Sequence, residues 1–467
     1  MRIRPGIAAL AASFVLLVHA AHAQTQPLDL RGAVAYALDH SPSILSKKAT
    51  LASAEATYAK EHAAEFPPIA GSVQNTVEKS ANVSGSFQQF GLTQANTYSQ
   101  NTAQIGTQWT IYNGSLAQIR AQQAKRQADA ARDDLRRAQQ QIAQEVTTAF
   151  YAVAARRENV RLTSADRAYQ QALLEVARNN ERVGRAAGVD VLRARVNELH
   201  AQALLATAQS DEATARETLA QTIGASPEQP FAVETILPEP ALPTTPLAAL
   251  IATAKANRSD IASARSSLDA ARLSNSLIDT DRFPQLSVNA SFGNQFSPTS
   301  YGSALAQIQN PVFGGSPRAT LARGNLGFWQ IGASETWQIG LIDYGARRAQ
   351  HRSARAGIDA ATATLTSVEN AVETDVRQAL RSAQTAAANL AYAKEGSSLG
   401  AESARIAQLQ YKNGLISLTD ATQAEQTNLS AQNDLVNAGV TYIGAIVHLR
   451  VSLGTSDPIA VVDLRKP

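Results

Sequence analysis

The chain has 467 residues, a formal net charge of +3 and no cysteine, and only 17% of its residues are charged. The lack of cysteine excludes a disulfide framework, a thiolate metal site, a cysteine nucleophile and a lipid-modified N-terminal cysteine. Its basic residues are interleaved with acidic ones, so the pI near 9.0 does not indicate nucleic-acid binding. Long stretches dominated by alanine and glutamine favour helix over an aromatic-rich core.

The first residues have the pattern of an export signal. Arg2 and Arg4 precede a short apolar run from Ile7 to Val18, and Ala21-His22-Ala23 supplies a small-x-small cleavage pattern. A transmembrane helix is the alternative, but the run is shorter than the roughly 20 apolar residues that a span requires. We predict that residues 1–23 are a cleaved signal peptide. No later stretch reaches spanning length without polar residues, so we do not expect a helical membrane protein.

The chain repeats itself. Phe66-Pro67 recurs 217 residues later as Phe283-Pro284, and the segment from Leu219 to Gly224 recurs 230 residues later as Leu449 to Gly454. The change of offset places an insertion of about fourteen residues in the second copy, between Ser297 and Asn325. We interpret this as a tandem duplication of residues 24–237 and 247–467, joined by a Pro-rich linker at 238–246.

Each half is predicted to contain a helix, two strands and two further helices. The first helix runs from about Ser41 to Glu65 and ends at Phe66-Pro67-Pro68, because proline restricts the preceding residue and cannot continue the helical hydrogen bonds. Strands are expected at about 69–79 and 102–113, with long helices within 115–223. In the second half the strands are expected at about 285–297 and 328–343, with long helices within 346–454.

The predicted strands alternate apolar and polar side chains. Between Leu286 and Gly293 every second residue is apolar, although Glu335 interrupts the apolar face of the next strand. A sandwich strand with one wet face would show the same alternation. Strands of about ten residues with aromatic ends are also typical of a membrane β-barrel, and no second sheet is predicted, so we favour the barrel.

Four strands cannot close into a barrel. A sheet in lipid can leave no edge unpaired, so the strands of several chains must be pooled. Two chains would give a barrel filled by side chains, whereas three or more would leave a lumen.

Two very long helices are expected after the strands. The segments from Ser115 to Arg182 and from Ala346 to Asn413 contain no proline, and 68 residues would rise roughly 100 Å. Their apolar residues are spaced by three and four, with occasional consecutive fours that unwind a left-handed supercoil. Such helices can run nearly straight as the staves of a tube. An ordinary coiled-coil stalk would show the same helical pattern.

These features together resemble the TolC family of outer-membrane efflux and secretion ducts, from about Leu28 to the C-terminus. The resemblance rests on the signal peptide, the duplication, the paired strands between helices, the Pro at the helix-to-strand step and two Gly-x5-Asp helical tips. It implies a mainly α fold with a β-barrel: a homotrimer whose 12-stranded outer-membrane barrel continues into a 12-helix periplasmic α-barrel. A small collar would comprise Phe231–Ile236, Thr244–Ala256 and Ile459–Leu464.

The resemblance also implies functional residues at the periplasmic tips. Asp420 corresponds to an aspartate ring at the tunnel entrance, and Gln423 stands where a second aspartate is common. Tyr411 and Asp190 correspond to a closed-state lock, whose additional arginine link is lost because that position is Ile416. The turns that would dock an adaptor protein are Val183-Gly184-Arg185 and Asn413-Gly414-Leu415. Alternatively, Asp190 and Asp420 are N-terminal helix caps, and the two roles are compatible.

The function implied is a passive exit duct of a tripartite efflux pump or a type I secretion system, located in the outer membrane with a long periplasmic portion. Its partners would be a periplasmic adaptor and an inner-membrane pump or ABC exporter, with no cofactor, metal or nucleic acid. The alternative is a structural periplasmic coiled-coil or adaptor protein without a channel. An enzyme is disfavoured, because no metal spacing, phosphate loop or nucleophile elbow surrounds the scattered histidines.

Overall fold

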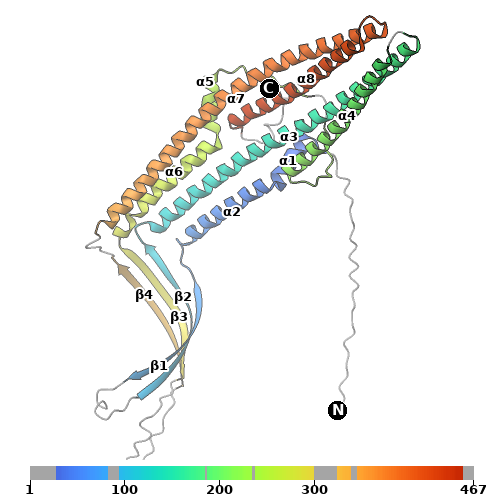
Figure 1. Ribbon diagram of the computed structural model, residues 1–467. Helices are drawn as coiled ribbons and strands as arrows, with labels where there is room; N and C mark the ends of the chain where they lie inside the picture. The colour runs from blue at the N-terminus through green and yellow to red at the C-terminus, as the bar shows by residue number, and fades with distance from the viewer. Residues whose placement is uncertain are drawn as a thin grey trace, which may run out of the picture.

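The computed structural model describes residues 28–82, 94–184, 187–233, 237–298, 323–337 and 344–455. A curved sheet lies at one end and long helices extend away from it (Figure 1). The predicted signal peptide, Arg185 and the collar segment Ile459–Leu464 lie outside the described residues.

The elements follow the duplicated order, with one further α-helix in each half and a short 3-10 helix in the second. The first half comprises α1 (Leu30–His40), α2 (Pro42–Ala63), β1 (Ala70–Asn82), β2 (Gln94–Tyr112), α3 (Leu116–Arg182) and α4 (Gly188–Ile223). The second comprises α5 (Leu247–Asn257), α6 (Ser259–Leu277), the 3-10 helix η2 (Thr280–Arg282), β3 (Gln285–Pro298), β4 (Arg323–Thr336), α7 (Ala346–Lys412) and α8 (Leu418–Ser452). The further α-helices are α1 and α5, which the sequence pattern of one helix before the strands did not include.

The four strands form one antiparallel sheet in the order β1-β2-β3-β4. Two of its strands begin earlier than expected, β2 at Gln94 and β4 at Arg323. Glycine allows close strand approach here: a Cβ on Gly293 would lie 2.6 Å from the carbonyl oxygen of Ala103. Within the described part of the chain, β1 and β4 each pair on one side only, so the sheet has two open edges.

One face of the sheet is apolar and uncovered. Val73 is 87% exposed and Trp329 is 75% exposed, and a row of paired residues crosses three strands through Ile105, Phe292 and Trp329. The other face carries small and amide side chains, of which Ser287 is buried. A sandwich requires a second sheet over the apolar face, but no described element packs there. A contiguous apolar surface of this kind marks contact with a membrane or another protein.

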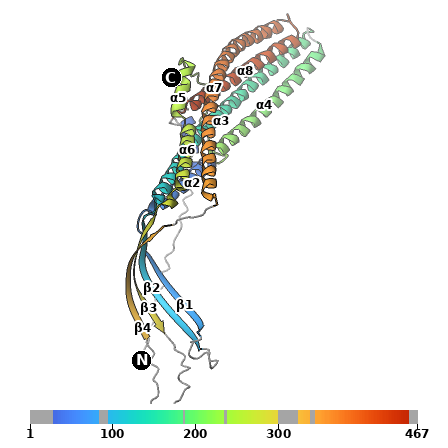
Figure 2. The ribbon, with the colours of Figure 1, turned by 90° about the vertical axis from the view of Figure 1, so that its left-hand side faces the viewer.

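The helices extend away from the sheet along the long axis of the molecule (Figure 2), and their neighbours change along the way. Next to the strands the neighbours run in the order α2-α3-α6-α7, and farther away in the order α4-α3-α8-α7. α3 and α7 have 67 residues each and take part in both arrangements. At 1.5 Å per residue each spans roughly 100 Å.

The duplicated apolar positions form the helical core. Val146 and Val153 in α3, and Val376 and Ala383 in α7, are all buried, as the spacing of three and four predicts. Each half closes at a glycine with positive φ. A Cβ on Gly224 would lie 2.7 Å from the carbonyl oxygen of His40, and the corresponding Gly454 packs equally closely on the loop between α5 and α6.

α8 is the one described helix that is long and apolar enough to cross a membrane by length and composition. It nevertheless packs against α7 and α3, and its apolar residues Ile443, Ile446 and Val447 are buried in a core cluster with α7. We therefore interpret α8 as a core helix of the helical region rather than as a membrane span.

Candidate functional site at the helical tips

Two helical turns lie at the end of the molecule farthest from the sheet (Figure 1). Val183 is the C-cap of α3 and Asn413 the C-cap of α7, and each is followed by a glycine with a left-handed backbone, Gly184 at φ 73° and Gly414 at φ 72°. The left-handed φ, rather than lack of space, requires glycine, because nothing lies within 4 Å of a Cβ added at either position. The side chains of Val183 and Leu415 are exposed.

One apolar cluster joins the two tips. Tyr411 of α7 packs in it with residues of α3, α4 and α8, so all four helices meet beneath the turns. The other buried members are Leu173, Leu174, Ala177, Ala194, Leu418 and Ala421. Ile416, which replaces the expected arginine link, packs against this cluster. The tips of one chain are thus held together by apolar contacts.

The hydroxyl of Tyr411 is buried without a partner. The residue is 6% exposed, and its oxygen makes no hydrogen bond within the described part of the chain. Burial, and then the negative charge of Asp190, raise the pKa of Tyr411. The structure therefore brings Tyr411 and Asp190 near one another without joining them. The Asp190 carboxylate lies 3.9 Å from the Arg193 guanidinium.

Asp420 forms a capping box at the start of α8. Its backbone N–H donates to Ser417 Oγ at 3.2 Å, and the Ser417 N–H donates to Asp420 Oδ2 at 3.3 Å. Ser417 is the N-cap, so Asp420 supports the cap from the third helical position. Asp190 lies in the first turn of α4 but makes no capping bond, since Ala187 holds that place. Asp420 and Gln423 are both exposed, one turn apart.

A group of buried carboxylates above the tips was not predicted. Asp166 of α3, Glu198 of α4 and Glu425 of α8 are all buried, and Asp166 and Glu425 interact electrostatically. Burial raises the pKa of Glu425; a hydrogen bond from Asn428 opposes this and the charge of Asp166 adds to it. These residues come from separate helices, so only their polar character at positions where the helical spacing expects apolar residues could have indicated them.

A cleft of about 390 Å³ opens beside these carboxylates, between α3, α4 and α8. Asp166, Asn197, His200 and Thr422 line it together with Gln426. The amide of Asn197 donates to the Thr422 hydroxyl at 3.4 Å, which links α4 to α8. Among the residues that the structure describes, no three His, Cys, Asp or Glu side chains are arranged to hold a metal ion.

Comparison with known proteins places this arrangement in a family. Solved structures similar to the chain include the outer membrane channel CmeC of Campylobacter jejuni, at 18% identity and a TM-score of 0.73, covering 91% of this chain and 85% of that one. The outer membrane protein VceC of Vibrio cholerae has 20% identity and a TM-score of 0.70, covering 91% and 96%. The open-state channel MtrE of Neisseria gonorrhoeae has 19% identity and a TM-score of 0.69, covering 91% and 88%.

No curated protein sequence matches the chain. The profile of one family, outer membrane efflux protein, matches residues 33–225 and 250–455. The first segment runs from within α1 to just past α4, and the second runs from within α5 to just past α8. With the open sheet, the long helical staves and the paired tips in place, the chain belongs to the outer membrane efflux protein family.

Proposed function

We propose that this protein is the outer-membrane exit duct of a tripartite efflux pump and conducts cargo passively. The observation that carries the proposal is the four-stranded sheet with an apolar outer face and two open edges, continued by four helical staves. In lipid an unpaired strand edge costs several kcal/mol for each bare backbone group. The edges of β1 and β4 must therefore pair with those of other copies.

Three copies satisfy this requirement and leave a passage. They supply twelve strands and, in each of the two helix arrangements, twelve helices, as the resemblance to the TolC family implies. Two copies would give eight strands, whose interior is filled by side chains. The apolar face then contacts outer-membrane lipid, and the helices extend roughly 100 Å into the periplasm.

The tips bind the partner protein and close the entrance of the tunnel. In the proposed trimer Asp420 forms a ring at the entrance, and Gln423 adds no charge to it. When the tips of the assembled trimer draw together, the unpartnered Tyr411 hydroxyl donates to Asp190, because a buried unpaired hydroxyl costs about 1–3 kcal/mol. A periplasmic adaptor docks on the turns Val183-Gly184-Arg185 and Asn413-Gly414-Leu415.

An inner-membrane pump supplies the energy and selects the cargo. The family match to efflux proteins favours such a pump over an ABC exporter of a type I secretion system. The solved relatives are named as outer membrane channels, which supports the role of an exit duct but does not bear on the choice of transporter.

Fractionation and bilayer recordings test this function. We expect heat-resistant trimers in the outer-membrane fraction that form ion-conducting channels and copurify with an adaptor. As a control, Val183→Asp with Leu415→Asp should keep trimers and conductance but lose the adaptor, because both side chains are exposed. A soluble periplasmic monomer would instead support the coiled-coil or adaptor alternative.

A further inference from the structure

The two longest helices both begin with basic charge alone. The first thirteen residues of α3, Leu116 to Ala128, and the first thirteen of α7, Ala346 to Ile358, contain no aspartate or glutamate. Acidic residues follow directly, at Asp129 and Asp359. The cations in these two segments are Arg120, Lys125 and Arg126 in α3 and Arg347, Arg348, Arg352 and Arg355 in α7.

Three arginines share one face of α7. Arg348, Arg352 and Arg355 follow the i, i+4, i+7 spacing, all are exposed, and none forms an ion pair with another described residue. Cations at the N-terminal end of a helix oppose the helix dipole. The helix dipole therefore does not account for Arg348, which lies in the first turn, and the exposed, unpaired face that it shares with Arg352 and Arg355 is suited to a negatively charged partner outside the chain.

The position of these arginines is just beyond the apolar face of the sheet. Trp337 and Tyr344, on either side of the step from β4 to α7, are both exposed, and exposed aromatic residues mark the border of a membrane. Arg348 and Arg352 lie two and six residues into α7, roughly 3 and 9 Å along its axis. The headgroup layer is about 5–8 Å thick on each side, within reach of an arginine side chain.

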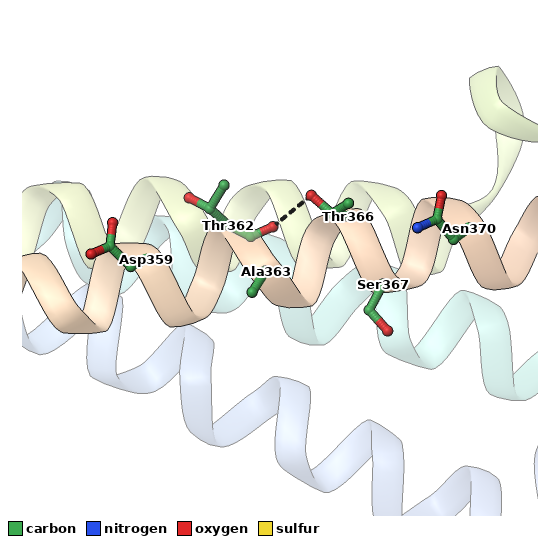
Figure 3. A pocket seen from close by; sticks show the side chains of 6 residues that line it. All are labelled: Asp359, Thr362, Ala363, Thr366, Ser367 and Asn370. Carbon is green, nitrogen blue, oxygen red and sulfur yellow. Dashed lines mark hydrogen bonds between the residues drawn. The ribbon is translucent and has the colours of Figure 1, made fainter.

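The basic stretch ends as sharply as it begins. The same face of α7 continues through Asp359, Thr362, Thr366 and Asn370, which line a shallow hollow (Figure 3). There the Thr366 hydroxyl donates to the carbonyl oxygen of Thr362 at 3.1 Å. This hydroxyl is satisfied by its own helix, and Asp359 ends the run of residues without an acidic neighbour that begins α7 next to the sheet.

The neighbouring copy does not offer a better partner. In the proposed trimer the free side of α7 faces α2 of the next chain. The acidic residues at the end of α2 nearest the sheet, and Glu65 just after this helix, already have partners in their own chain. Glu55 accepts from Arg132 at 2.8 Å, Glu61 lies 3.6 Å from Lys60, and Glu65 lies 3.5 Å from His62.

We propose that a basic belt, defined as Arg120, Lys125, Arg348, Arg352 and Arg355, binds the phosphate groups of anionic phospholipids in the periplasmic leaflet of the outer membrane. Arginine forms paired hydrogen bonds with phosphate oxygens, and basic clusters beside a membrane segment select anionic lipids. The inference rests on the proposed membrane location. In this proposal the border between the helices and the strands binds lipid phosphate groups, whereas the apolar sheet contacts only the hydrocarbon chains.

Lipid retention by the purified full-length trimer tests the belt. The variant is Arg348→Gln, Arg352→Gln and Arg355→Gln together. The control is Lys47→Gln, Arg167→Gln and Arg381→Gln, which removes three exposed, unpaired cations of the described chain far from the sheet. Trimers are exchanged into phosphatidylglycerol or phosphatidylcholine and weighed by native mass spectrometry. We expect the wild type and the control to retain phosphatidylglycerol preferentially, and the variant to lose roughly tenfold or more of this preference.

Three results would overturn the proposal. Equal retention of phosphatidylglycerol by the variant would show that the arginines do not bind lipid. If the variant changes anion permeability but retains lipid as the wild type does, the three arginines lie in the lumen. If its trimers dissociate in both lipids alike, the arginines form a contact between subunits. Failure of the wild type to insert into either lipid would contradict the proposed function itself, whereas channels with no lipid preference would contradict only the belt.

Discussion

The two halves of the molecule share an apolar framework but not their buried polar groups. Val146 and Val376 are buried at equivalent places, and Gly224 and Gly454 close the two halves in the same way. The buried charges have no such counterparts: Arg258 corresponds to Ser41, Asp166 to Gly396 and Glu425 to Arg195. The duplication therefore supplies helices with equivalent apolar cores. The two halves differ in buried polar residues that are present in only one of them.

The largest expected effect comes from Arg258, which is 6% exposed. Its guanidinium contacts Asp260 at 2.6 Å and Asp375 at 2.5 Å, and it donates to the carbonyl oxygen of Ser452 at the end of α8. Arg258→Met removes the guanidinium that pairs with both carboxylates, leaving Asp260 only the Ile261 N–H and Asp375 only His448, and should destabilise the protein by about 3–5 kcal/mol. Ser41→Ala in the first half should cost only about 1 kcal/mol. Thermal unfolding of purified trimers compares them, and equal losses would contradict the contrast.

The same cluster predicts an acid response. Although burial acts to raise the pKa of Asp260, the Arg258 guanidinium holds it below the ordinary value of about 3.8. This contribution to stability is present above pH 3.8 and is lost as the pH falls through the depressed pKa. The difference in melting temperature between the wild type and Arg258→Met should therefore shrink below about pH 3.8. A constant difference would exclude the ion pair as its source.

The second effect concerns closure of the tips. In the proposed closed trimer, a hydrogen bond from Tyr411 to the charged Asp190 would contribute about 1.5–3 kcal/mol, once in each of three subunits. Tyr411→Phe with Asp190→Ala should raise single-channel conductance and antibiotic entry without lowering trimer yield. The matched variant Tyr411→Ala also removes apolar contacts of the tip cluster. If only Tyr411→Ala raises conductance, closure depends on apolar packing and not on the hydroxyl.

A smaller effect is expected at Glu425. Its pKa is raised, so the folded protein binds the proton more tightly than the unfolded chain and the carboxylate reduces stability at neutral pH. Stability should rise as the pH falls from the raised pKa toward the ordinary value. Glu425→Gln should gain about 1 kcal/mol at pH 7.5 and flatten this part of the pH profile. A pH profile identical to that of the wild type would show that the Glu425 proton plays no part.

The smallest effect is expected at the entrance ring. Three Asp420 carboxylates around one axis would attract polyvalent cations, and Gln423 adds no second ring. Asp420→Ala should weaken the block of conductance by hexamminecobalt severalfold. Ser417→Ala is the control, because it removes the capping box but leaves the carboxylate. Equal block in wild type and Asp420→Ala would remove the ring assignment.

Much of the fold could be predicted because the regular spacing of apolar residues and the duplication of the sequence are strong signals. Pro67 and Pro284 mark the helix-to-strand steps, and the spacing of Val146 and Val376 identifies the buried helix faces. Helices α1 and α5 have only eleven residues each, too few for a clear period. The early start of β2 at Gln94 was missed because its first residues lack apolar alternation.

The site was predictable only in part. The tip glycines follow from sequence, because a left-handed turn after a long helix requires them. The capping box of Asp420 also follows from local spacing to Ser417. The burial of the Tyr411 hydroxyl and the proximity of Asp166 to Glu425 depend on packing between helices distant in sequence, which no local pattern encodes.

Cross-linking of the two open sheet edges tests the central claim most directly. The chain contains no cysteine, so Ser72→Cys in β1 with Ser334→Cys in β4 introduces the only two thiols. A short flexible thiol cross-linker applied to outer membranes should produce covalent dimers and trimers and nothing larger, while either single variant stays monomeric under denaturing conditions. Monomers alone from conducting channels, or a ladder extending beyond three chains, would contradict a closed barrel built from three copies.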